Sequence, residues 1–442
     1  GKDALGQNTV GSDSVAVGKG ALQAFTGSSS VGGSVAVGRD SLYSLTTGES
    51  HVAIGENAGY SVTTGNNTVA IGKLALYANT GNDNTAVGHQ TLQANTSGTN
   101  NVAIGRDALN DNTTGSQNVA VGSNCLDSNT TASGNVGVGH NTLQAVTTGS
   151  ANTGIGDGAL YLNTGSYNTA LGNGALQQNT SGINNTALGQ GCLDANTTAN
   201  NNTGAGYLAL STNTTGASNT GLGAYALNAN STASNCTGVG YAALFYNTSG
   251  SDNTSLGFYA LFNNTTGIRN TAVGRDALTA CTTGGENTAI GRNAGNTTTT
   301  GANITCLGHS AQASSATANN EVTIGNANVG SVRCGPGAVT GLSDGRDKTD
   351  VVDLPDGLDF VNTLRPVKFK WQTREGLPNK DGKIRAGFIA QDLQKATEGK
   401  EYLDLVYSEN PDKLEVTKAN LLPILVNAIK ELSAKVTALE AG

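Results

Sequence analysis

The chain has 442 residues with 62 glycines, no methionine and one tryptophan, and only 13% of its residues are charged, about half the usual share. The formal net charge of −8 argues against a nucleic-acid partner, and no apolar run reaches the ~20 residues that a membrane-spanning helix needs. This composition excludes one large aromatic core and favours a fold that buries small side chains many times over.

A short repeat fills residues 1 to about 325. A Gly closes a short apolar strand every 17 residues, apart from one step of 20 and two of 16. This period predicts a parallel β-solenoid or β-roll in which each coil pairs with the next. The chain begins inside a repeat, so we expect a fragment or a processed product. One copy reads Asn101-Val102-Ala103-Ile104-Gly105, then Ala108-Leu109 and Asn112-Thr113-Thr114-Gly115.

Alternation along each strand predicts which side chains enter the coil. The first and third residues of the strand share one face, and the central Ala lies on the other. We expect the aliphatic residue before the Gly to pair in the core with the Leu four residues after that Gly, as Ile104 with Leu109 and Val273 with Leu278. Gly and Asn should form the corners, because both tolerate positive φ.

The repeats resemble the head repeats of trimeric bacterial adhesins of the YadA type, in which Asn-Ser-Val-Ala-Ile-Gly units form a left-handed parallel β-roll. Ser14-Val15-Ala16-Val17-Gly18 and Ser34-Val35-Ala36-Val37-Gly38 match that motif. The resemblance implies a homotrimeric shaft. The period is shorter in that family, so the shape and the handedness of the coils stay open here.

Three groups of side chains in the repeats have more than one interpretation. Rows of Thr and Asn could bind ice or a glycan, but we favour ladders along the rod. The cysteines show no metal-ligand or disulfide spacing, so we expect small buried side chains and neither cofactor nor metal. Eight aromatic residues could bind cells or sugars or pack between chains. The cysteines are Cys125, Cys192, Cys236, Cys281, Cys306 and Cys334, and the aromatic residues are Tyr207, Tyr225, Tyr241, Phe245, Tyr246, Phe258, Tyr259 and Phe262.

The composition changes after Gly325, where the repeat stops. Gly335-Pro336-Gly337 marks a joint rich in breakers. We expect a solenoid shaft over residues 1–328, a linker over 329–341 and a small α/β domain over 342–442. In that domain, residues 367–371 alternate like a half-buried strand, and 387–393 have an apolar stripe suited to the start of a helix.

Apolar residues spaced three and four apart predict a short parallel coiled coil over about 420–440 that joins three chains. The alternative is an amphipathic helix packed on its own domain. The expected trimerisation seam consists of Leu422, Leu425, Ile429, Leu432, Val436 and Leu439.

The C-terminal motifs resemble the intramolecular chaperone autoprocessing domain that ends phage endosialidases and many phage tail fibres. The resemblance implies a domain that assembles the trimer and then cuts itself off between Leu342 and Ser343. It implies Ser343 as the nucleophile and Lys348 as its general base. The matching motifs are residues 342–348, 364–367 and 387–391 and the closing run from 421 to 432.

We therefore expect a phage tail-fibre-like host-attachment shaft on the virion, with single-turnover Ser–Lys self-cleavage as its only enzymatic activity. The expected partners are two further copies of the chain and a host cell-surface receptor, either a glycan or a protein. The alternative is a bacterial trimeric surface adhesin that carries the same chaperone. An ice-binding solenoid or a depolymerase fits less well, because each strand has about one Thr and no pair of acidic residues recurs.

Overall fold

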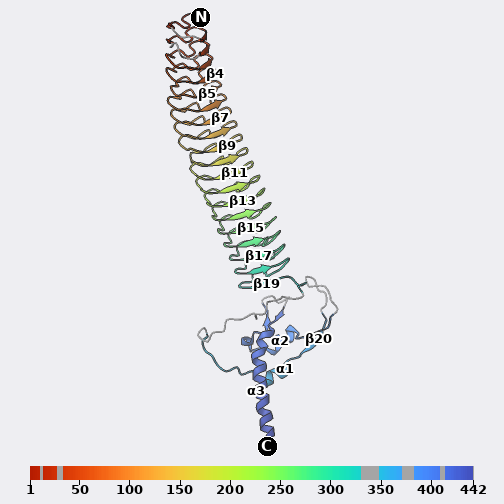
Figure 1. Ribbon diagram of the computed structural model, residues 1–442. Helices are drawn as coiled ribbons and strands as arrows, with labels where there is room; N and C mark the ends of the chain where they lie inside the picture. The colour runs from red at the N-terminus through yellow and green to blue at the C-terminus, as the bar shows by residue number, and fades with distance from the viewer. Residues whose placement is uncertain (10–12, 27–32, 330–347, 371–382, 409–413, 442) are drawn as a thin grey trace.

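The computed structural model describes residues 1–9, 13–26, 33–329, 348–370, 383–408 and 414–441. The first three segments form a long rod of stacked coils, and the others form a small α/β region beyond its last strand (Figure 1). The mainly β solenoid that the repeat predicts is therefore confirmed, with coils of about 17 residues.

In the described part of the shaft, each coil contributes one three-residue strand to a single parallel sheet of nineteen strands. Consecutive strands pair in register, so that Ala103 lies opposite Ala120. The strands are β1 (Val15–Val17), β2 (Val35–Val37), β3 (Val52–Ile54), β4 (Val69–Ile71), β5 (Thr85–Val87), β6 (Val102–Ile104), β7 (Val119–Val121), β8 (Val136–Val138), β9 (Thr153–Ile155), β10 (Thr169–Leu171), β11 (Thr186–Leu188), β12 (Thr203–Ala205), β13 (Thr220–Leu222), β14 (Thr237–Val239), β15 (Thr254–Leu256), β16 (Thr271–Val273), β17 (Thr288–Ile290), β18 (Thr305–Leu307) and β19 (Val322–Ile324).

The strand face that fills each coil is the opposite of the expected one. Ala103 is fully buried, whereas Ile104 is 41% exposed, so the predicted core pair of Ile104 with Leu109 is wrong. The pair of Val273 with Leu278 fails in the same way, since Val273 is only half-buried. The Leu of each pair does lie in the core.

Space inside the coil explains this reversal. A coil of 17 residues is narrow, and its Leu side chain already occupies most of the interior. The central residue of each strand, which faces this Leu, is always a small one: Ala, Gly, Ser, Cys or Thr. In β9, even a Cβ added at Gly154 would lie 2.8 Å from Thr142 Cγ2. A central Ala therefore fits the close packing of the interior, and the larger side chains of the strand point outward.

The corner after each strand requires glycine. Gly105 has a φ of +132°, which L-residues rarely adopt. A Cβ at this position would also lie 2.5 Å from the carbonyl oxygen of Gly122 in the next coil. The column of closing glycines thus allows the corners of successive coils to stack directly on one another.

Two rows of asparagine run along the interior of the rod. In the first row, Asn112 Nδ2 donates to Asn95 Oδ1 at 2.6 Å and to the carbonyl of Gly115 at 3.0 Å. In the second, Asn101 Oδ1 accepts the backbone N–H of Asn118 at 3.0 Å. Buried amides are costly unless they are hydrogen-bonded, so these ladders tie each coil to its neighbours. The expected Asn ladders are confirmed.

Five cysteines are buried in the shaft, as expected, and carry free thiols. Burial raises the pKa of Cys125 and of Cys192 to about 12, so both thiols stay protonated and act as small apolar groups. Cys334 lies outside the described residues.

In its described residues, the C-terminal region combines short strands with three α-helices and two short 3-10 helices. The expected strand after Pro366 is present as β20, but the expected helix begins only at Ala390, after Gly387 has ended a strand. None of the described helices is long and apolar enough to cross a bilayer. The elements are α1 (Leu358–Thr363), β20 (Val367–Phe369) antiparallel to β21 (Arg385–Gly387), α2 (Ala390–Ala396), η2 (Glu401–Leu403), β22 (Val406–Tyr407) antiparallel to β23 (Glu415–Val416), η3 (Lys418–Asn420) and α3 (Leu421–Glu440).

Candidate functional site

The expected cleavage segment lies at the edge of the described chain. Leu342 and Ser343 fall outside the described residues, and Lys348, where the C-terminal region begins, has an exposed side chain. The pairing of Ser343 with Lys348 therefore stays a prediction. A few residues further on, the chain enters the packed interior at Asp356.

The buried carboxylate of Asp356 is the centre of a polar cluster that the sequence did not reveal. Its carboxylate accepts hydrogen bonds from the ammonium of Lys400 and the hydroxyl of Tyr402. Burial alone would raise the pKa of Asp356, but these hydrogen bonds outweigh it and leave the pKa below its usual value. Asp356 lies in the sequence Leu354-Pro355-Asp356-Gly357, and no local pattern links it to residues more than forty positions away.

The first turns of α3 pack against the same part of the region. Leu421 and Ile424 are buried in a small apolar core with Phe360 of α1. The side chain of Asn427 donates to the carbonyl of Leu354 at 2.9 Å, and Glu431 accepts the N–H of Leu358 at 2.8 Å. Helix α3 is thus anchored next to the segment that leads from the expected cleavage site.

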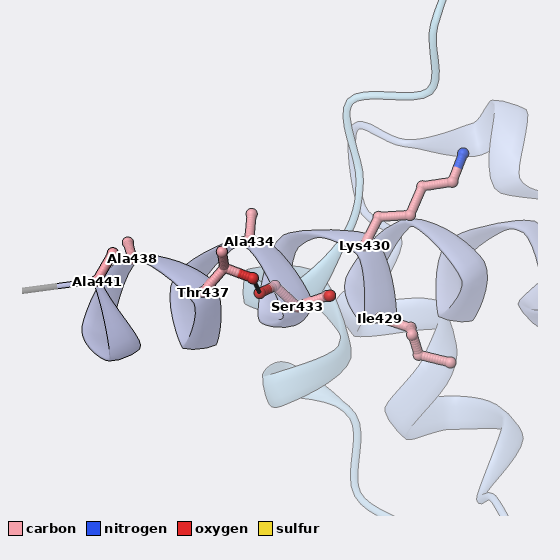
Figure 2. A pocket seen from close by; sticks show the side chains of 7 residues that line it. All are labelled: Ile429, Lys430, Ser433, Ala434, Thr437, Ala438 and Ala441. Carbon is pink, nitrogen blue, oxygen red and sulfur yellow. Dashed lines mark hydrogen bonds between the residues drawn. The ribbon is translucent and has the colours of Figure 1, made fainter.

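The predicted coiled-coil seam lies on another face of α3. All six of its side chains, from Leu422 to Leu439, are at least 40% exposed. In the outer half of the helix, Ser433, Ala434, Thr437 and Ala438 line a shallow hollow with Ile429 at one end (Figure 2). Packing of α3 on its own domain therefore uses a second set of residues and leaves the seam uncovered.

The shaft has a similar uncovered face along its sheet. The third residue of each strand points away from the coil, and Ile104, Ile155 and Leu256 are each about 40% exposed or more. These residues lie one above another because the strands pair in register. The result is a continuous apolar row parallel to the rod, far larger than isolated surface side chains would produce.

The comparisons with known proteins identify the C-terminal region. Residues 343–402 match the family model described as Chaperone of endosialidase, the S74 peptidase family. The chain carries an S74 endosialidase chaperone domain. The comparisons with curated proteins and with solved structures returned no match.

The S74 match has direct consequences for the chain. It begins at Ser343 and includes all three members of the Asp356 cluster. An S74 domain implies autoproteolytic self-cleavage and a trimeric assembly, and it is typical of phage tail proteins. The match ends at residue 402, so α3 and its exposed seam lie beyond it.

Proposed function

We propose that this chain is a phage tail-fibre-like attachment shaft whose S74 domain trimerises it, aligns its coils and then separates from it by cleavage between Leu342 and Ser343. The observation that carries the proposal is the S74 match directly after nineteen nearly identical coils. A bacterial trimeric surface adhesin with the same chaperone is the second candidate, and the association of S74 domains with phage tails favours the first.

A shaft of this kind needs an alignment device. If one chain were shifted by one coil relative to its neighbour, equivalent residues would again lie opposite one another. The correct and the shifted alignments of the shaft would therefore have similar stabilities. The seam of α3, with Ile429 and Leu432 exposed, is suited to knobs-into-holes packing in a trimer. Three chains joined there would begin to stack from a common starting point.

The outward apolar row of the sheet would then form the contact between shafts. Its members include Ile104 and Leu256, whose burial between chains would stabilise the trimer through the hydrophobic effect. Once this contact has formed, removal of the chaperone would leave the trimer kinetically trapped.

The proposed cleavage is an acyl shift followed by hydrolysis. Ser343 Oγ attacks the Leu342 carbonyl carbon while Lys348, as the general base, takes the hydroxyl proton. The peptide C–N bond breaks, the Ser343 nitrogen receives a proton, and Leu342 is left as an ester on Ser343. Water then hydrolyses this ester to a Leu342 carboxylate and restores the Ser343 hydroxyl.

Substitution of the nucleophile tests this proposal. Wild-type protein should yield two fragments, and mass spectrometry should find a new N-terminus at Ser343. Ser343→Ala should remain one chain of 44.3 kDa on a denaturing gel. Ser331→Ala, a serine in the same joint, is the control and should cleave normally. Two fragments from Ser343→Ala would contradict the proposed cleavage site.

A further inference from the structure

Between β12 and β16, the eight aromatic residues from Tyr207 to Phe262 form one connected cluster, which we name the aromatic band. Successive ring contacts join all of them, with centroids between 4.1 and 6.2 Å apart. Tyr207, Tyr241, Tyr246 and Phe258 remain more than 40% exposed. The Asn ladders and the buried Leu column do not need these rings, because the other coils stack without them.

Ring orientation distinguishes the band from a structural stack. Phe245 and Phe262 are stacked at 5.3 Å, and Tyr246 meets both edge-to-face at interplanar angles of 79° and 78°. Tyr246 is 46% exposed, so part of its ring remains open to solvent. By contrast, Tyr43, Tyr60 and Tyr77 stack nearly parallel at 5.0 and 5.1 Å, and cover one another's faces.

Basic residues gather at one end of the band. Between Arg106 and Val329 the sequence contains no lysine and only three arginines, Arg269, Arg275 and Arg292. The Arg275 guanidinium lies 5.6 Å from the centroid of the Phe258 ring. Its Nε binds Asp276, which leaves the Nη groups of an exposed guanidinium free for another acceptor. Arg292 occupies the same position one coil further on.

We propose that the aromatic band, together with Arg275 and Arg292, binds an acidic glycan of the host surface. Pyranose rings present apolar C–H faces that stack on tyrosine, while guanidinium groups pair with an anionic group on the sugar. The coil spacing of ~4.8 Å is close to the length of one sugar unit in an extended glycan, so the chain can lie along the rod. This inference rests on the proposed attachment function.

A second copy of the chain is the competing occupant. It explains the band less well, because the apolar row formed by residues such as Ile104 and Leu256 runs the whole shaft, whereas the band covers a few coils. Five of the eight rings are tyrosines, whose hydroxyls would need partners if they were buried between chains. Sugar hydroxyls can supply such partners.

The test uses trimers produced from the full-length chain, on immobilised oligosaccharides that carry carboxylates, phosphates or no charge. We expect wild type to bind a charged oligosaccharide, and Tyr246→Ala and Arg275→Gln to bind it about tenfold or more weakly. Tyr60→Ala, from the parallel stack, is the matched control and should bind like wild type. Comparison of the carboxylated with the phosphorylated oligosaccharides shows which anionic group the site binds.

Each other outcome overturns the inference. Binding to no oligosaccharide, binding to uncharged ones alone, or full binding by Tyr246→Ala would remove the glycan site. Loss of the trimer in Tyr246→Ala, measured by light scattering, would assign the band to the contact between chains. The proposed assembly and cleavage would survive all of these results, because Ser343→Ala tests the cleavage and substitution in the seam of α3 tests the assembly.

Discussion

At the scale of single residues, the interior of a coil imposes strict limits on size and polarity. Ala103 is fully buried, while the larger Ile104 beside it points outward. The buried polar positions are occupied mainly by Asn, because its amide donates and accepts along the rod at the same time. A different side chain at one of these buried positions should therefore change the stability of the shaft measurably.

His51 is such a side chain, since it stands in the second asparagine row. It is buried, with Nδ1 2.6 Å from Thr68 Oγ1 and Nε2 2.7 Å from the carbonyl oxygen of Gly65. Burial lowers the pKa of His51 below 6.5, although the Gly65 carbonyl opposes this shift. The unfolded chain therefore binds the proton more tightly than the folded chain does.

The stability that neutral His51 contributes is complete above pH 6.5 and is lost as the pH falls toward the lower pKa of the folded state. We expect the melting temperature of the shaft to drop between about pH 7.5 and pH 5.5, and less so in His51→Asn, which restores the usual ladder residue. His89→Asn, at an exposed position, is the control for thermal melts followed by circular dichroism. Equal pH dependence in wild type and His51→Asn would contradict this assignment.

At the scale of elements, α3 has one apolar face that is buried and one that is exposed. Leu421, Ile424 and Ala428 attach the helix to its domain, and the seam from Leu422 to Leu439 remains exposed. The heptad spacing predicted the second face from the sequence. Packing on its own domain was the alternative to the coiled coil; the structure shows this packing and leaves the coiled coil a prediction.

Substitution in the seam should distinguish the roles of the two faces. In the uncleaved Ser343→Ala background, Ile429→Asp should abolish the trimer while the domain stays folded, because the charge would be buried only between chains. Lys430→Asp, at an exposed position away from the seam and its flanks, is the control and should remain trimeric. Sedimentation measures the assembly and circular dichroism the fold. A trimeric Ile429→Asp protein would show that the seam does not join the chains.

At the scale of the whole molecule, a repetitive shaft is followed by a domain of ordinary composition. The repeats supply many equivalent contacts, so in-register trimers depend on a starting point outside them. The S74 domain, which implies a trimeric assembly, stands at the end where such a starting point is needed.

Deletion of the domain should therefore impair assembly. A chain that ends at Gly341 should give monomers or misaligned aggregates. The shaft released from the full-length wild-type chain should remain trimeric after the chaperone fragment has been removed. Native mass spectrometry distinguishes monomers, trimers and aggregates by their mass. The two shafts can be compared directly, because they differ only in the residues next to the cut. Equal trimer yields from both would mean that the shaft aligns itself.

The sequence by itself determined the solenoid, its period, the heptad seam and the chaperone motifs, because each of these is a regularity of spacing or order along the chain. Only the tertiary structure decided which strand face is inside, since alternation defines two faces and the width of the coil selects one. It also brought Asp356 to Lys400 and Tyr402 and left Tyr246 nearly half exposed within the aromatic band. Contacts between residues distant in sequence leave no local pattern from which they could have been predicted.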